Sequence, residues 1–354
     1  MDKWIMKKLT IAIPTYNREK NVRSKIEEIS THIIENGLDD FICLMIVDNY
    51  SNDYDLEQLK SEYKSINFIQ FHKNLSNIGA GANFLRCVEL ANSEYVWLLG
   101  DDENLELKNL DSHSLLKKLL ESLKDCDCYL LPHNESYAER AAYFGKFRSV
   151  DDLLDNYFHF GSFFVLSIYI FKKDSAIKYM KMAYEAILYQ HPYSAIALQM
   201  LESKNDIELI KISILRIQSP KTARFDIVNA HIDAAYTVKP YLDQKQFWKY
   251  LKKDFLLREK EIFSFNIGIS NPVSLNNLTY NYKRTMAIAP LKSKLFLKSL
   301  IWLGLVELRK NSYITAFIIY MYSHVIKTMF SEMSYNDIYL EIESNLSDST
   351  DLRH

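Results

Sequence analysis

Residues 9–19 decide the fold, and they are LTIAIPTYNRE. The first five are apolar or β-branched, which is typical of a short buried strand. Pro14 and the polar residues after it end the strand, and from Val22 to Ile33 apolar side chains recur at helical spacing. The stretch therefore predicts a strand, a loop and a helix in that order.

The alternation of strands and helices continues to about residue 100, and further strands follow. Strands alternating with helices imply right-handed crossovers and a largely parallel, buried sheet. We therefore expect an α/β fold, a Rossmann-like and mostly parallel sheet flanked by helices. Apolar runs predict its other strands over residues 42–47, 68–71, 95–99, 128–132 and 163–171.

At 354 residues the chain exceeds the usual size of one hydrophobic core. We expect a catalytic α/β domain over residues 1–225, which includes a helix over residues 183–201. The pattern then becomes helical, which predicts a C-terminal helical domain over residues 226–354. No run of about 18 uncharged residues occurs in residues 291–330, so that stretch predicts either a buried helical pair or a helix lying in the plane of a membrane surface.

Charge and cysteine content narrow the class of protein. The chain has 43 basic and 45 acidic residues, which disfavours a nucleic-acid binder that relies on a basic surface. The four cysteines stand mostly in apolar stretches without the histidines or second Cys-x-Cys pair of a zinc site. They indicate reduced core residues of a cytoplasmic protein, and the N-terminal residues lack the apolar core of a signal peptide.

Polar loops follow three of the predicted strands, at residues 15–19, 48–53 and 100–103. In parallel α/β sheets ligands bind beyond the carboxyl ends of the strands. Two adjacent carboxylates, Asp101 and Asp102, are costly there unless positive charge compensates them. Mg²⁺ or Mn²⁺ would do so and would complete its shell with phosphate oxygens of a nucleotide diphosphate. The alternative is an acidic helix cap or a solvated loop.

Three motifs in this order and spacing carry a family resemblance, namely IAIPTYNRE at 11–19, IVDNYSND at 46–53 and LLGDDE at 98–103. The chain resembles family 2 glycosyltransferases with a GT-A fold over roughly its first hundred residues. The resemblance implies transfer of a sugar, with inversion, from a nucleotide-diphosphate sugar to a saccharide or lipid-linked acceptor in bacterial surface-polysaccharide assembly. An acceptor of that kind would fit membrane contact at the inner face of the cell membrane.

The resemblance also implies a donor site and a metal site. Asp102 matches the metal ligand, with Asp101 beside it, because Gly100 stands where the family's Asp-x-Asp motif would begin. Asp48 matches the aspartate that binds the nucleobase edge, although aspartate is equally common as a turn residue. Tyr16 would stack on the base and Pro14 would stiffen the turn. The predicted donor-binding residues are Pro14, Thr15, Tyr16, Glu19, Asp48, Asn77, Gly79, Asn83 and Asp101.

The catalytic base is less clearly marked. Glu185 and His191 lie at the right place in the chain for a base that deprotonates an acceptor hydroxyl. A histidine before a proline is also common as a loop or cap residue, and His133 after the fifth strand is a second possibility. If the chain lacks a base altogether, it would be a catalytically silent nucleotide-sugar-binding assembly subunit.

Other nucleotide-binding classes lack their motifs here. The first strand-to-helix turn contains no glycine, which excludes the dinucleotide fingerprint of a Rossmann oxidoreductase. No Gly-Lys-Ser or Gly-Lys-Thr occurs, which excludes a P-loop. A nucleotidyltransferase shares the sheet and the metal-bound diphosphate, but it normally carries a glycine-rich basic loop that is absent after the first strand.

Overall fold

The computed structural model describes residues 7–108, 113–132, 144–156, 163–189, 191–216, 237–243 and 246. The chain divides into two units, residues 1–219 with 236–250, and residues 220–235 with 251–354. All described residues belong to the first unit. The predicted helical domain over residues 226–354 falls almost wholly outside them, and it stays a prediction together with the boundary at 225.

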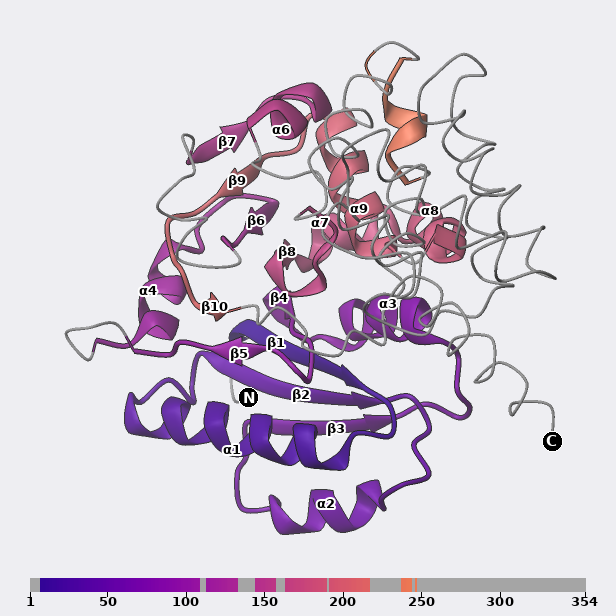
Figure 1. The fold of residues 1–354 in the computed structure, drawn as a ribbon. Helices are drawn as coiled ribbons and strands as arrows, with labels where there is room; N and C mark the ends of the chain where they lie inside the picture. The colour runs from indigo at the N-terminus through magenta and orange to yellow at the C-terminus, as the bar shows by residue number, and fades with distance from the viewer. Residues whose placement is uncertain are drawn as a thin grey trace, which may run out of the picture. The chain divides into compact units, whose positions relative to one another are not determined.

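An eight-stranded sheet with the order β3-β2-β1-β4-β8-β6-β9-β7 organises the described unit (Figure 1). The strands from β3 to β4 are parallel, as are β6 and β9, whereas β8 is antiparallel to both neighbours and β7 to β9. The expected mostly parallel α/β sheet is confirmed. Its strands are β1 (Lys7–Thr15), β2 (Ile42–Asp48), β3 (Ile69–Lys73), β4 (Ser93–Leu98), β6 (Cys128–Leu130), β7 (Gly145–Phe147), β8 (Tyr169–Lys172) and β9 (Ile207–Leu209).

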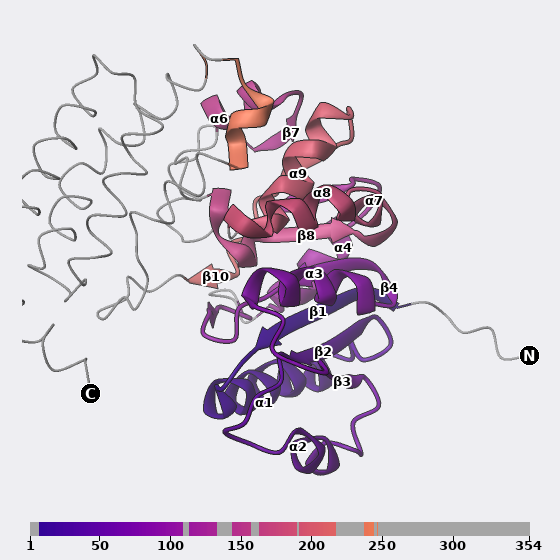
Figure 2. The same cartoon turned by 90° about the vertical axis from the view of Figure 1, so that its right-hand side faces the viewer.

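A separate two-stranded sheet pairs β5 (Asn104–Leu105) with β10 (Leu215–Arg216). Helices α1 and α2 lie on one face of β1, β2 and β3, and α3 lies on the other (Figures 1 and 2). The described helices are α1 (Glu19–Glu35), α2 (Leu56–Glu62), α3 (Ala80–Leu90), α4 (Leu115–Ser122), α6 (Val150–Asn156), α7 (Lys173–Ile177), α8 (Met180–Glu185) and α9 (Pro192–Glu202).

The core lies between these layers. Ile11, Leu44 and Trp97, on the three central parallel strands, have no exposed surface. Burial of such side chains contributes about 1.5–3 kcal/mol each. The four cysteines are also buried and form no disulfide, as the apolar sequence around them predicts. Within the described part of the chain, no helix is both long and apolar enough to span a membrane.

The strand predicted over residues 163–171 is mostly wrong. Only its end forms β8, because the chain first makes a turn of 3-10 helix at Leu166–Ile168. In that turn the carbonyl oxygen of Ser167 accepts a hydrogen bond of 2.7 Å from the indole Nε1 of Trp97. The turn therefore places Ser167 in contact with Trp97 and Gly100 at the end of β4.

The single helix predicted over residues 183–201 is also wrong. Helix α8 ends at Glu185, a 3-10 turn follows at Ala186–Tyr189, and α9 begins at Pro192. Proline has no backbone N–H to donate and disfavours the helical conformation of the residue before it. It is well suited to the first position of a new helix, which is where Pro192 lies.

Candidate donor-binding site

The carboxyl ends of β1, β2 and β4 meet at one edge of the sheet. Thr15 and Asp48 are register partners at the ends of β1 and β2. Just after β4, the backbone N–H of Leu99 donates to the carbonyl oxygen of Ala12 over 2.9 Å. The hydroxyl of Thr15 then donates to Asp101 Oδ2 over 2.8 Å. Two of the three loops predicted to carry function are thus joined by a side-chain contact.

Arg18 connects the first loop to both carboxylates of the acidic pair. Its Nη1 donates to Asp101 Oδ1 over 2.7 Å and to Asp102 Oδ2 over 2.8 Å. The side chain of Asp101 is only 5% exposed, whereas those of Arg18 and Asp102 are 49% and 60% exposed. The pair therefore has one buried member and one that faces solvent.

The charges in this cluster act on one another. Burial raises the pKa of Asp101 above its usual range, although the charge of Arg18 and the hydrogen bond from Thr15 oppose the shift. Burial alone would lower the pKa of Arg18, but the two carboxylates outweigh it and raise that pKa. Arg18 accordingly stays charged and stabilises the ionised form of Asp101.

Ser167 holds the acidic loop in shape. Its hydroxyl accepts from the backbone N–H of Gly100 over 3.0 Å and donates to Glu103 Oε1 over 3.0 Å. A Cβ atom at Gly100 would lie 3.2 Å from Glu103 Cγ and 3.3 Å from Asp102 Oδ1. An aspartate at position 100, where the Asp-x-Asp motif would begin, would therefore require these neighbours to move.

Asp101 and Asp102 supply a donor set that fits Mg²⁺ or Mn²⁺. Among the described residues, no three His, Cys, Asp or Glu side chains are grouped so as to hold a metal ion. A protein that supplies only one or two carboxylates, with phosphates and water as the other ligands, is nevertheless the usual arrangement for Mg²⁺ at nucleotide sites. In this structure the positive charge beside the pair is that of Arg18, which lies within hydrogen-bonding distance of both carboxylates.

Asp48 shapes the second loop. Its fully buried carboxylate accepts hydrogen bonds from the backbone N–H and the hydroxyl of Ser51 and from Tyr54 Oη. Ser51 in turn accepts from the backbone N–H of Asn17 in the first loop over 2.8 Å. These contacts are those of a turn residue, and the nucleobase contact of Asp48 stays a prediction. The ring of Tyr16 in the first loop is 42% exposed.

Four asparagines tie the start of α3 to the end of β2. Asn49 Nδ2 donates to Asn77 Oδ1, and the amide of Asn74 donates to the side-chain oxygens of Asn49 and Asn83, all over 2.8–3.0 Å. Asn49 and Asn74 had not been singled out from the sequence. Gly79, just before α3, has φ +84° and ψ 157°, a conformation that is essentially restricted to glycine. The network thus fixes the predicted residues Asn77, Gly79 and Asn83 at the same edge of the sheet.

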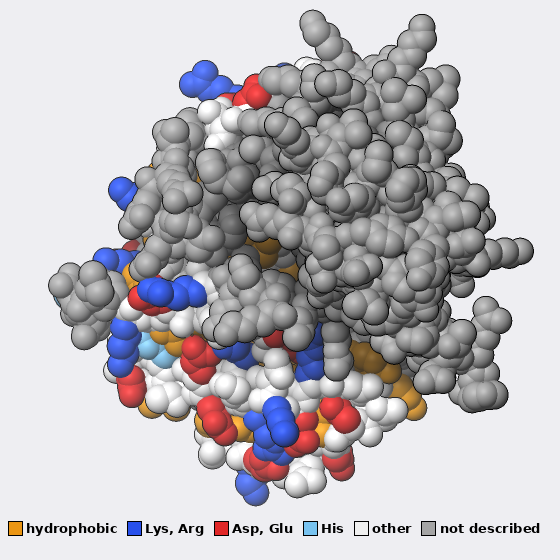
Figure 3. All heavy atoms as spheres, in the orientation of Figure 1, with side chains coloured by type: hydrophobic (Ala, Val, Ile, Leu, Met, Phe, Trp, Pro, Cys, Tyr) orange, Lys and Arg blue, Asp and Glu red, His pale blue; other side chains and the backbone are white. Residues whose placement is uncertain are grey.

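Glu19 and Pro14 lie at the borders of the first loop. Pro14 is buried in β1 beside its register partner Val47. Glu19 begins α1 and accepts a hydrogen bond of 2.8 Å from Arg23, which also pairs with Glu62 at the end of α2. On the face that α1 and α2 form, acidic and basic side chains are interspersed (Figure 3). Glu19 is therefore held in an ion-pair cluster between two helices.

His191 is buried immediately before α9. Its Nδ1 lies 3.1 Å from Tyr193 Oη, which donates to the carbonyl oxygen of Phe164 over 2.7 Å. The one hydroxyl hydrogen of Tyr193 goes to Phe164, so the tyrosine oxygen is left to accept from Nδ1–H of His191. Glu185, the other predicted base, is exposed at the end of α8.

Residues on both sides of His191 pack on the first turns of α3. A Cβ at Gly81 would lie 3.4 Å from the side chain of Ile187 and 3.7 Å from that of Pro192. The ring of Phe84, one turn further along α3, contacts the ring of Tyr193 with centroids 5.8 Å apart. His191 therefore lies close to the helix that begins at the loop edge. His133 lies outside the described residues, and the catalytic assignments stay predictions.

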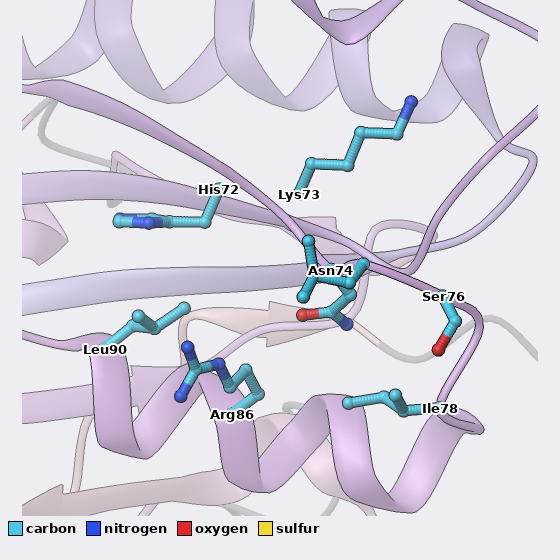
Figure 4. A pocket seen from close by; sticks show the side chains of 8 residues that line it. His72, Lys73, Asn74, Ser76, Ile78, Arg86 and Leu90 are labelled. Atoms are coloured by element: carbon cyan, nitrogen blue, oxygen red, sulfur yellow. The ribbon is translucent and has the colours of Figure 1, made fainter.

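A hollow of about 300 Å³ lies beside this edge, between β3 and α3 (Figure 4). His72 reaches it from β3, and Arg86 and Leu90 reach it from α3. None of the predicted donor-binding residues lines it. Burial, with the nearby charges of Arg86 and Lys60, lowers the pKa of His72, so its ring is neutral near pH 7.

Comparison with known proteins identifies the domain to which this edge belongs. Residues 10–144 match the family model described as glycosyl transferase family 2. The chain carries a family 2 glycosyltransferase domain. All three loops and the acidic pair lie within the matched residues, and the resemblance inferred from the three motifs is confirmed.

Two curated relatives are similar to about a third of the chain. Abequosyltransferase RfbV of Salmonella typhimurium is 35% identical over 129 residues, which are 36% of this chain and 36% of RfbV. An uncharacterized glycosyltransferase of Methanocaldococcus jannaschii is 29% identical over 120 residues, 34% of this chain and 39% of that protein. The chain thus matches little more than a third of the length of either relative.

A solved structure shares the fold. TarS of S. aureus, residues 1–349 in complex with UDP, superimposes with a TM-score of 0.54 at 15% identity, covering 85% of this chain and 90% of TarS 1–349. The same TarS fragment without that ligand gives a TM-score of 0.51 at 16% identity. At such low identity the likeness is one of fold, and it confirms the GT-A fold of the family 2 domain.

Proposed function

We propose that this protein is a glycosyltransferase that moves a sugar from a nucleotide-diphosphate sugar to a saccharide or lipid-linked saccharide during cell-surface polysaccharide assembly. The observation that carries the proposal is the contact between the strand ends, where Thr15 and Arg18 from the first loop hold Asp101 and Asp102 from the third. The family 2 match covers these residues. The abequosyltransferase name of one relative and the UDP bound to TarS support a nucleotide-sugar donor.

The donor nucleotide would lie over the edge formed by the first two loops. Tyr16 is exposed there and offers an aromatic face to the nucleobase. Asp48 and the four asparagines hold the loops around it, and Gly79 keeps the backbone close by the absence of a side chain. The remaining predicted residues, Pro14 and Glu19, would position the first loop.

Asp102, with Asp101 behind it, would hold a divalent cation together with the donor diphosphate. When bound, Mg²⁺ or Mn²⁺ neutralises the charge that develops on the departing diphosphate. Hydrogen bonds within the protein position the two carboxylates. Thr15 holds one oxygen of Asp101, and Ser167 holds the loop that carries both residues. Asp102 is the exposed member of the pair and would be the carboxylate that contacts the ligand.

The acceptor would be activated from the side of α9. His191 lies just before α9, and its segment packs against α3. Its imidazole would take the proton of the acceptor hydroxyl, whose oxygen then displaces the nucleotide diphosphate with inversion. Glu185 is the alternative base. A lipid-linked acceptor would place the protein at the inner face of the cell membrane.

Replacement of Asp102 tests the donor and cation assignment. Asp102→Ala should abolish Mn²⁺-dependent binding of UDP, GDP, CDP and dTDP, measured by isothermal titration calorimetry, while circular dichroism stays unchanged. Asp40→Ala is the matched control, because Asp40 is exposed just before β2, at the opposite edge of the sheet. Unchanged cation-dependent nucleotide binding in Asp102→Ala would remove Asp102 from the site.

Turnover separates the enzyme from a silent binding subunit. A glycosyltransferase should hydrolyse its donor slowly in the presence of Mn²⁺ even without an acceptor, since water can replace the acceptor hydroxyl. His191→Gln should reduce acceptor-dependent transfer while leaving nucleotide affinity unchanged. Nucleotide binding without any hydrolysis or transfer would favour the silent subunit.

A further inference from the structure

We propose that Arg18 is the built-in counterion of the Asp101–Asp102 pair and competes with a divalent cation for it. The inference rests on the proposed function, because it concerns cation binding at the same site. A single nitrogen, Arg18 Nη1, lies 2.7 Å from an oxygen of one carboxylate and 2.8 Å from an oxygen of the other. A cation held by both carboxylates would lie next to the guanidinium of Arg18. Two positive charges at such a distance repel each other strongly.

The buried member of the pair explains why a counterion is present. Asp101 is 5% exposed, and an ionised carboxylate buried without a partner is strongly destabilising. Arg18 holds Oδ1 and Thr15 holds Oδ2, so each oxygen of Asp101 already has a hydrogen-bond partner. The lone pairs that remain on these oxygens belong to a buried side chain, and the charge of Arg18 opposes the approach of a cation to them. Asp102, which is 60% exposed, is the only open carboxylate of the pair.

Arg18 is placed so that it can leave. It is the N-cap residue of α1, its side chain makes no capping hydrogen bond, and that side chain is 49% exposed. A diphosphate offers the guanidinium oxygens that it binds in a charge-assisted, bidentate manner. When a nucleotide diphosphate draws Arg18 away, both carboxylates become available to the cation. Cation and nucleotide then promote each other's binding, and this coupling must be reciprocal.

The test measures Mn²⁺ alone, without nucleotide. Electron paramagnetic resonance of free Mn²⁺ gives its affinity for the full-length wild-type protein, for Arg18→Gln and for Arg86→Gln. Glutamine removes the charge but keeps a hydrogen-bond donor. Arg86 is the matched control, because it is a half-exposed arginine of α3 that pairs with Glu89 over 3.0 Å. Arg18→Gln should bind Mn²⁺ at least about tenfold more tightly than wild type, and Arg86→Gln should bind like wild type.

Two further variants locate the effect. Arg18→Lys keeps the positive charge and should bind Mn²⁺ as weakly as wild type, even if Arg18→Gln lowers stability. Asp102→Asn combined with Arg18→Gln should return the affinity to a weak value, since the open carboxylate is lost. Gain of Mn²⁺ affinity in Arg18→Gln but not in Arg18→Lys supports a competition between charges.

The results that overturn the inference are equally defined. Equal Mn²⁺ affinity in wild type and Arg18→Gln would show that Arg18 does not compete with the cation. Absence of Mn²⁺ binding to both proteins would also overturn the inference. Neither result depends on a nucleotide-sugar. Failure of the proposed function has a different signature, namely no binding of any nucleotide to any variant.

Discussion

Loss of the Thr15 hydroxyl should destabilise the protein because it leaves one oxygen of the buried Asp101 carboxylate without its hydrogen bond from Thr15. Thr15→Val keeps the shape and the β-branched side chain, so it leaves no cavity and no change in strand preference. It removes the 2.8 Å hydrogen bond to Asp101 Oδ2. Hydrogen bonds to ionised groups are worth about 1.5–3 kcal/mol. Because Arg18 still holds the other oxygen, we expect a loss of about 2 kcal/mol in the free energy of unfolding.

The same substitution elsewhere on β1 gives the control. The hydroxyls of Thr10 and Ser93 share a buried hydrogen bond of 2.7 Å between neutral groups. Thr10→Val should therefore cost about 1 kcal/mol, the typical value of a neutral hydrogen bond. Urea unfolding at pH 7.5, followed by tryptophan fluorescence, compares the two variants. Equal losses within about 0.5 kcal/mol, smaller than the gap between the two classes of bond, would refute a special role for the charge of Asp101.

Two other substitutions test the loop and the pH dependence. Gly79→Ala should cost about 1–3 kcal/mol, because its φ of +84° is strained for alanine. Gly81→Ala, whose Cβ would make an ordinary 3.4 Å contact with Ile187, should change thermal stability by less than about 1 kcal/mol. Equal effects of the two alanines would show that the conformation at Gly79 carries no strain. Burial lowers the pKa of His32, whose Nε2 is hydrogen-bonded to Ser114. Below about pH 6.5 the unfolded chain therefore binds a proton at this histidine that the folded chain does not bind. The free energy of unfolding then decreases as the pH is lowered. His32→Gln should flatten that fall between pH 7 and pH 5.5, and an unchanged slope would contradict the assignment.

The central strands and the first helices were predictable because their patterns are local. Apolar runs placed β1, β2 and β4 to within two residues at each end, since buried parallel strands are apolar throughout. Pro192 marks the break between α8 and α9 in the sequence. The prediction of one continuous helix missed it, because the apolar residues on both sides recur at helical spacing. The turn before β8 was not readable, because it depends on a hydrogen bond from the distant Trp97.

The candidate site was predicted in outline, and its partners were not. The sequence indicates that the carboxylates at 101 and 102 need positive charge, and Arg18 is the one basic residue in the first loop. Which loop faces the pair depends on the strand order, in which β4 lies beside β1 and not beside β3. That order follows from a crossover that residue spacing does not reveal. For the same reason the hydrogen bonds of Ser167 to the acidic loop were missed.

The central claim is that this edge of the sheet binds a nucleotide-sugar together with a cation, and a thermal-shift screen tests it most directly. The purified protein is heated with UDP-, GDP-, CDP- and dTDP-sugars, each with and without Mn²⁺ or Mg²⁺. A ligand that binds only the folded state raises its melting temperature. We predict a cation-dependent rise with the sugars of one nucleotide, which disappears in Asp102→Ala. No rise with any of them, in the presence of either cation, would contradict the claim.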